Sequence, residues 1–149
     1  MSEHKVDLSW NRGDRGFEYR QYSRNHQWLF PNGLKFEVSA AAEFLGDTTK
    51  VDPEAAFVGS LSSCHLLTFL AICSRKNILV ESYVDQAVGF LEKNQEGKLV
   101  ITRIELHPII HFGDGINLSR AELEALHKQA EDECFLANSV TTKMETIIH

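Results

Sequence analysis

The chain has 149 residues, of which 43% are hydrophobic and 24% are charged, and its formal net charge is −6. This length fits one domain, residues 1–149, that buries a core of its own. The acidic balance gives no electrostatic footprint for nucleic acid or for an anionic membrane. The charged start Met1–Asp7 lacks the pattern of a signal peptide, and only three cysteines occur, so we expect a cytoplasmic protein without a disulfide framework.

The N-terminal part of the chain predicts strands joined by turns. Lys5–Trp10 matches a short strand, and Phe17–Phe30 matches a longer one beyond a turn-prone stretch. Pro31–Gly33 signals a tight turn, and Leu34–Ser39 alternates apolar and polar residues as a half-buried strand does. We expect this last segment to form one arm of a hairpin.

A long helix is predicted next. Asp52 offers an N-cap, Pro53 suits the first turn, and Glu54 is an acid that the helix dipole favours. Ala55–Cys73 is apolar on almost every side but is interrupted by serines and a histidine, and Ser74–Asn77 closes it. The pattern therefore favours a central buried helix over a membrane span.

The second half of the chain predicts a hairpin, a helix and a strand. Val80–Leu91 and Leu99–Phe112 match two long strands joined by a polar turn. Ser119 and Glu122 form a capping-box signature that begins a second helix, and Ser139–Ile148 returns as a final strand. The order β-β-β-α-β-β-α-β places the chain in the α+β class.

Two cysteines lie far apart in the chain, Cys64 in the first predicted helix and Cys134 near the end of the second. A thiolate that attacks a peroxide becomes a sulfenic acid, and a second thiol within reach captures it, so the pair favours a peroxide-reducing role. The carboxylates of Glu131–Glu133 should raise the pKa of Cys134, which suits a resolving thiol. On the pattern alone, Cys64 and Cys134 are also compatible with inert positions in the core. We expect the third cysteine, Cys73, to be such a core residue.

Several motifs together resemble one family. Asp52–Phe57 followed by Ser62–His65 is similar to the Pro-Glu helix start and peroxidatic cysteine of the OsmC/Ohr family, named for osmotically inducible protein C and organic hydroperoxide resistance protein. Cys134 matches the second cysteine of that family. Phe135 stands where the family often has proline, which indicates a divergent OsmC-like branch. The resemblance implies an OsmC-like fold with a central buried helix, assembled as an intertwined homodimer.

The resemblance also implies a function, a thiol-dependent peroxidase that reduces organic hydroperoxides to alcohols. In such an enzyme Cys64 attacks the peroxide, becomes a sulfenic acid and forms a disulfide with Cys134. The family implies no metal, haem or flavin, and a dithiol reductant that is either a lipoylated protein or a thioredoxin-like protein. It also implies a basic residue in the N-terminal β region, which the alignment of turns places at Arg24, with Arg20 as the alternative.

Arg24 and Glu54 are expected to activate Cys64. The thiol needs a nearby cation to favour the thiolate, and an arginine keeps its charge and can also hydrogen-bond the peroxide oxygen. Glu54 would orient that guanidinium through a bidentate contact. Because ten residues of helix, roughly 15 Å, separate Glu54 from Cys64, we expect the partner subunit to supply Glu54.

Other functions stay open on the sequence. A cysteine-nucleophile hydrolase or acyl transferase would need a histidine base near Cys64, but His65 faces about 100° away from it on a helix. A noncatalytic, dimeric binding domain would keep both thiols buried. His107 and His111 lie four residues apart on one strand face, which is a weak metal-site pattern that Pro108 weakens further, so we expect no metal site.

Overall fold

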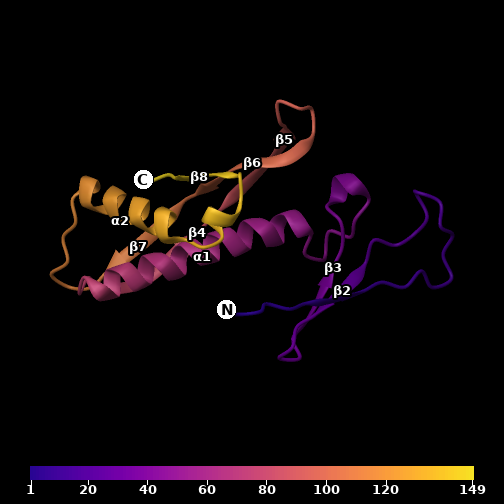
Figure 1. Cartoon of the computed structure of the whole chain (residues 1–149), viewed down its shortest axis with the longest axis horizontal. Coiled ribbons are helices and arrows are strands. Elements are labelled where there is room, and N and C mark those ends of the chain that lie inside the picture. Colours follow the sequence, from indigo (N-terminus) through magenta and orange to yellow (C-terminus); the bar gives the residue numbers. More distant parts are fainter. The chain divides into compact units, whose positions relative to one another are not determined.

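The computed structural model describes residues 1–149 and divides into two compact units, Met1–Ala56 and Phe57–His149, which we describe separately. In chain order the elements are β1 (Asp7–Ser9), β2 (His26–Leu29), β3 (Lys35–Val38), η1 (Ala42–Phe44), α1 (Pro53–Arg75), β4 (Val80–Asp85), β5 (Val88–Lys93), β6 (Leu99–Leu106), β7 (Pro108–Phe112), α2 (Arg120–Glu133), η2 (Ala137–Ser139) and β8 (Lys143–Thr146) (Figure 1). The α+β class is confirmed.

The first unit is built on an antiparallel sheet in the order β1-β2-β3. The predicted hairpin is confirmed, because β2 pairs with β3 and places Trp28 opposite Phe36. Gly33, in the turn between them, has a φ of 86°, which is the left-handed conformation that favours glycine. Val38 is fully buried and forms a parallel bridge with Val51, so the chain just before α1 is tied to the sheet.

The long strand predicted over Phe17–Phe30 is wrong in its first half, because only β2 is extended. Before β2 the chain turns, and the amide of Gln21 donates to the carbonyl of Glu18 at 2.8 Å. The guanidinium of Arg24 then bends back and donates to the carbonyl of Tyr22 at 2.7 Å. These local bonds satisfy backbone groups that a strand would have paired with a neighbour, so apolar alternation alone did not decide the conformation.

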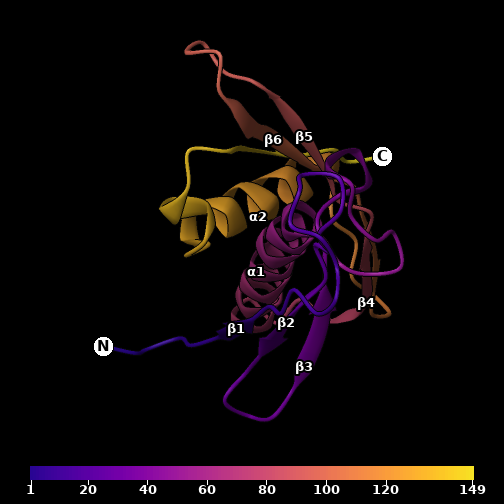
Figure 2. The ribbon, with the colours of Figure 1, turned by 90° about the vertical axis from the view of Figure 1, so that its right-hand side faces the viewer.

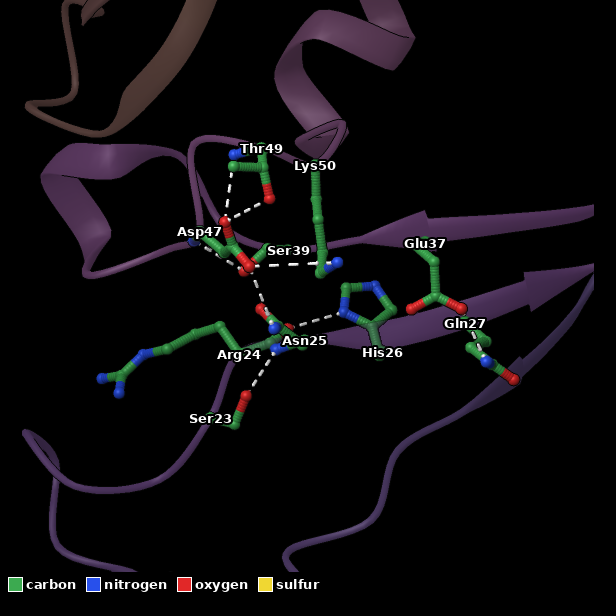
Figure 3. A network of polar contacts seen from close by, with 10 residues as sticks. All are labelled: Ser23, Arg24, Asn25, His26, Gln27, Glu37, Ser39, Asp47, Thr49 and Lys50. Atoms are coloured by element: carbon green, nitrogen blue, oxygen red, sulfur yellow. Dashed lines mark hydrogen bonds and ion pairs between the residues drawn. The ribbon is translucent and has the colours of Figure 1, made fainter.

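A network of polar contacts lies beside the sheet of the first unit (Figure 3). The Asp47 carboxylate accepts hydrogen bonds from the Thr49 amide at 3.0 Å and from the Asn25 side chain at 3.2 Å. These bonds, led by those from Thr49, lower the pKa of Asp47. The Asp47 amide also donates to the Ser39 hydroxyl at 3.0 Å. The network joins the loop before α1 to β2 and β3.

The second unit packs its helices against two small sheets. One sheet pairs β4 with β7, and the other has the order β5-β6-β8, with β8 parallel to β6. Both views show α2 lying beside α1 (Figures 1 and 2). One buried cluster joins Phe69, Ile72 and Cys73 of α1 to Leu126 and Ala130 of α2. A second cluster is formed around the first half of α1 by Leu61, Ile104, Leu106 and Met144.

The predicted second hairpin is present, but each of its two long strands is divided into two. β5 pairs with β6 next to the turn, and β4 pairs with β7 farther from it. The Asp85 carboxylate accepts hydrogen bonds from the backbone amide of His107, at 2.7 Å, and from the hydroxyl of Ser62. Because the His107 amide bonds to a side chain instead of a strand, the ladder breaks between β6 and β7.

The helix α1 begins and ends close to the predicted positions, and the Asp52 carboxylate caps it by accepting from the Ala55 amide at 2.8 Å. By length and composition α1 is apolar enough to cross a membrane. It is instead the core helix of the second unit, since residues on one of its faces are buried against strands and α2. Close packing is evident at Gly89, where a Cβ would lie 2.4 Å from Val58 of α1.

Candidate active site

The first thiol of the candidate site lies in the middle of α1. Cys64 is partly exposed, and its carbonyl accepts a hydrogen bond from the Thr68 hydroxyl at 2.9 Å. Leu61, one turn earlier, and His65, the next residue, are both buried. The helix therefore holds Cys64 at the border between its buried face and its open face.

The second thiol is placed by the end of α2. The predicted capping box is confirmed, because the Ser119 hydroxyl accepts from the Glu122 amide and the Glu122 carboxylate accepts from the Ser119 amide. At the other end Cys134 is the C-cap residue, and its amide donates to the Glu131 carbonyl at 3.3 Å. The amide of Ala137 donates to the Cys134 sulfur at 3.4 Å. Contacts on both sides thus fix this thiol.

The two sulfur atoms meet between the helices. The Cys134 thiol donates to Cys64 Sγ across 2.7 Å, although 70 residues separate them in the chain, and both cysteines are free. Cys134 is fully buried. Burial raises the pKa of its thiol, and the hydrogen bond to Cys64 raises it further. The predicted direction of this pKa shift is confirmed, but its main cause is burial rather than the neighbouring carboxylates.

A cavity of about 790 Å³ opens at Cys64. Its walls come from the open face of α1 and from the segment that follows α2, and most of them are apolar. Among its large hydrophobic side chains, Leu67 is 64% exposed and Phe135 is 83% exposed. The lining residues are Ser60, Ser63, Cys64, Leu67, Thr68, Ala71, Arg75, Glu133, Phe135, Leu136 and Asn138. An apolar molecule that enters this cavity reaches Cys64, whereas Cys134 lies behind it.

The structure does not bring Arg24 and Glu54 together. The Arg24 guanidinium donates to the carbonyls of Tyr22 and Tyr19 and lies over the Tyr22 ring, with its central carbon 3.9 Å from the ring centroid. Figure 3 shows this side chain extending away from the Asp47 network. One Glu54 carboxylate oxygen is buried without a hydrogen-bond partner, ten residues before Cys64 on α1. Arg20 lines a polar pocket of the first unit together with Arg24.

A buried histidine pair, His65 and His127, lies between α1 and α2. His65 Nε2 and His127 Nδ1 are 3.0 Å apart, the rings are nearly parallel, and each ring has one further nitrogen that is buried without a partner. The sequence analysis missed His127. It lies on the apolar stripe of α2 with Leu123, Leu126 and Ala130, and a histidine on such a stripe is a usable signal for a buried contact.

The histidine pair should make the protein less stable in acid. Burial lowers the pKa of His65 and of His127 to about 4, from an ordinary value of 6.5, although the Asp85 carboxylate opposes the shift at His65. A depressed pKa means that the unfolded chain takes up protons first, so stability present above about pH 6.5 is lost as the pH falls toward 4. We expect a loss of about 1 to 2 kcal/mol per histidine between about pH 7 and pH 5, measured by urea unfolding.

Replacing both histidines by glutamine tests the assignment, because two amides can still bond to each other but do not titrate. The double variant H65Q/H127Q should lose most of the pH dependence in this range, while His4→Gln, at an exposed position, should keep it. The charged groups around His127 are Glu124, Lys128 and Glu131. If the free energy of unfolding of the double variant depends on pH as strongly as that of the parent protein, those charged groups and not the histidines cause the loss of stability in acid.

His107 and His111, the histidines of the weak metal-site pattern, have other neighbours. His107 Nδ1 lies 3.2 Å from His149 Nε2, and His107 Nε2 lies 3.6 Å from the Glu105 carboxylate. His111, the other member of the predicted pair, faces Ser82 in the ladder between β4 and β7. No group of three or more histidine, cysteine or acidic side chains gathers in a metal-binding arrangement. No histidine lines the Cys64 cavity, which leaves the hydrolase alternative without a base.

The structure is a mixed α+β fold in which two thiols are in contact between the helices, and comparisons with known proteins agree with the fold. The model of the family described as OsmC-like protein matches residues 46–149. The chain therefore belongs to the OsmC-like family. No curated protein matches it.

Solved structures similar to this one belong to the same family. An OsmC-like protein of unknown function from Vibrio cholerae is 44% identical, with a TM-score of 0.95 and 100% of each chain covered. An organic hydroperoxide resistance protein OsmC from Legionella pneumophila is 18% identical, with a TM-score of 0.71 over 99% of this chain and 97% of that one. An organic hydroperoxide resistance protein from Elizabethkingia anophelis is 19% identical, with a TM-score of 0.71, covering 99% and 95%. The last two likenesses show the fold.

Proposed function

We propose that the protein is a thiol-dependent peroxidase that reduces organic hydroperoxides to alcohols. The observation that carries the proposal is the contact between Cys64 and Cys134, with Sγ atoms 2.7 Å apart and only Cys64 open to the apolar cavity. The names of family members with the same fold, which describe organic hydroperoxide resistance, support the same chemistry.

The reaction begins when the Cys64 thiolate attacks the distal oxygen of the hydroperoxide. The O–O bond breaks, the alkoxide takes a proton and leaves as the alcohol, and Cys64 becomes a sulfenic acid. The Cys134 sulfur then attacks the Cys64 sulfur, the S–O bond breaks and water leaves, so that a disulfide joins the two residues. The raised pKa of Cys134 keeps it a thiol until this step, as suits the resolving residue.

A second copy of the chain would complete the site. In this proposal Arg24, or Arg20 as the alternative, supplies the cation that favours the Cys64 thiolate, and Glu54 orients it from the partner subunit. Glu54 has a buried oxygen without a partner, which supports a role in binding a cation. The exposed Leu67 on the open face of α1 supports a homodimer that covers this face.

The proposed cycle needs two electrons from outside the protein. A dithiol reduces the disulfide by thiol–disulfide exchange, and we propose that a lipoylated or thioredoxin-like protein supplies it. Both kinds of donor work in a reducing compartment, which places the proposed activity in the cytoplasm. The chemistry needs no metal or cofactor, because the thiols carry both electrons.

Intact mass and a free-thiol count test the proposal. The reduced protein should lose two thiols and about two mass units after one equivalent of cumene hydroperoxide, since disulfide formation removes two hydrogens. The Cys134→Ser variant should stop at a sulfenic acid on Cys64 and proceed to a sulfinic acid with excess peroxide. Tryptic mapping should assign the new bond to Cys64 and Cys134.

The third cysteine is the internal control. Cys73 is buried, and burial raises the pKa of its thiol, so it should remain free in every sample. Three unreacted thiols in the parent protein would overturn the peroxidase proposal and favour a noncatalytic binding domain. A disulfide that includes Cys73 would overturn the assignment of Cys134 as the resolving residue.

A further inference from the structure

The buried pair of His65 and His127 lies beside the thiol pair on both helices. His65 directly follows Cys64 on α1, and His127 precedes Cys134 by seven residues on α2. Seven residues are close to two helical turns, so His127 and Cys134 start from nearly the same side of α2. The histidine contact and the thiol contact therefore join neighbouring parts of the same two elements.

The histidine contact is directional and closed to water. His65 and His127 are 1% and 3% exposed, and the ring nitrogens that face each other are 3.0 Å apart. The His127 ring also stacks on Phe69, with ring centroids 4.5 Å apart, and Phe69 lies one turn after His65 on α1. Two consecutive turns of α1 thus hold one ring of α2.

The other contacts between the helices constrain their relative position less. The Arg75–Glu133 ion pair is exposed to solvent, and such pairs contribute little. The apolar cluster of Phe69, Leu126 and Ala130 favours burial but no single direction. A hydrogen bond fixes both a distance and an angle. Because burial lowers the pKa of both histidines to about 4, the rings are neutral at neutral pH, so one nitrogen can donate and the other can accept.

The position of α2 on α1 decides the fate of the sulfenic acid in the proposed cycle. A sulfenic acid on Cys64 is either captured by Cys134 or oxidised by a second peroxide to a sulfinic acid. Capture requires the two sulfur atoms to approach each other, and a misplacement of about 1 Å can slow such a step by about a hundredfold. A contact that fixes the helices beside the thiols therefore controls which reaction wins.

We propose that His65 and His127 are positioning residues for disulfide formation: their hydrogen bond fixes α2 on α1, so that Cys134 reaches the Cys64 sulfenic acid before a second peroxide does. The inference rests on the proposed peroxidase function and assigns a residue pair to its second step. The histidines take no proton from the reacting sulfurs in this role, since their rings bond to each other and not to a cysteine.

Two double variants separate the hydrogen bond from the packing. H65L/H127L replaces both rings with apolar side chains, which removes the bond without leaving one partner unsatisfied. H65Q/H127Q keeps a bond between two amides. Leu61→Ala is the control for a general loss of packing, because Leu61 belongs to the buried cluster of the strands and not to the one shared with α2. Urea unfolding establishes that each variant is folded.

The first quantity to measure is the concentration of cumene hydroperoxide at which half of Cys64 becomes sulfinic acid, detected as a gain of about 32 mass units. It should fall by roughly ten- to a hundredfold in H65L/H127L and stay close to the parent value in H65Q/H127Q and in Leu61→Ala. The rate of the first oxidation of Cys64 should change by less than about twofold, because that step does not involve Cys134. An unchanged concentration in H65L/H127L, or an equal fall in Leu61→Ala, would overturn the positioning role.

A measurement without peroxide separates this inference from the peroxidase proposal. Equilibration with reduced and oxidised glutathione gives the effective concentration of the two thiols, because the disulfide then forms by exchange. That concentration should fall by roughly tenfold or more in H65L/H127L and be retained in H65Q/H127Q. If this holds while the parent protein reduces no hydroperoxide, the positioning of the thiols stands and the peroxidase proposal fails. If the parent reduces the hydroperoxide and H65L/H127L keeps the parent value, the role of the histidines is wrong and the peroxidase proposal stands.

Discussion

Replacing Cys64 with serine should abolish peroxide reduction, with a loss of at least about a thousandfold in kcat/KM for cumene hydroperoxide. A hydroxyl has nearly the same size as a thiol but is not ionised at neutral pH, so the nucleophile disappears while the shape of the helix is kept. The rate is measured as peroxide consumption with dithiothreitol as the dithiol. Circular dichroism of the variant should match that of the parent protein.

The matched control for this experiment is Cys73→Ala. Cys73 is on the same helix, is buried at 1% exposure and does not line the Cys64 cavity. Its removal should change kcat/KM by less than about twofold, because it takes no part in the proposed cycle. If Cys64→Ser kept its activity while Cys73→Ala lost it, the nucleophile would be Cys73 and the proposed site would be wrong.

The substitution Leu61→Ala should lower the free energy of unfolding by about 2 to 5 kcal/mol. Leu61 has no exposed surface and packs with Ile104, Leu106 and Met144 where α1 meets the sheet of β5, β6 and β8. Truncation removes buried apolar surface and leaves a cavity that surrounding strands fill only in part. Urea unfolding followed by circular dichroism measures the change.

Leu67→Ala is the matched control, because it is the same substitution on the same helix at a side chain that is 64% exposed. In a single chain, Leu67→Ala should lower the free energy of unfolding by no more than about 0.5 kcal/mol. If Leu67→Ala costs as much as Leu61→Ala, and the cost depends on protein concentration, Leu67 is covered by another copy in solution. Equal costs without a concentration dependence would contradict the burial of α1 described above.

Local signals in the sequence were sufficient for both helices. Asp52 caps α1, and the Ser119–Glu122 pair caps α2, because each cap bonds within three or four residues. The Asn32-Gly33 turn predicted the hairpin for a similar reason. The strand over Phe17–Phe30 was predicted too long, because side-chain bonds to nearby carbonyls replaced strand pairing.

The roles expected for Arg24 and Glu54 stay predictions. Both residues depend on contacts that no local pattern encodes, and Arg24 is held in this chain by the carbonyls of Tyr22 and Tyr19. Arg75 was not singled out from the sequence, and Glu133 was named only as a carboxylate beside Cys134, because charged residues are common at helix ends. Their positions in the Cys64 cavity became visible only when α1 and α2 were seen side by side.

Short-range patterns of residue type were enough to predict the α+β class, the two helices with their caps, and the family resemblance. The contacts between distant side chains depend on how the helices pack. This packing brings Cys64 within 2.7 Å of Cys134 and His65 within 3.0 Å of His127. These pairs lie 70 and 62 residues apart in the chain. The short distances between these side chains result from the packing of α2 on α1 over the buried cluster of Phe69, Leu126 and Ala130. Such packing is a property of the whole core.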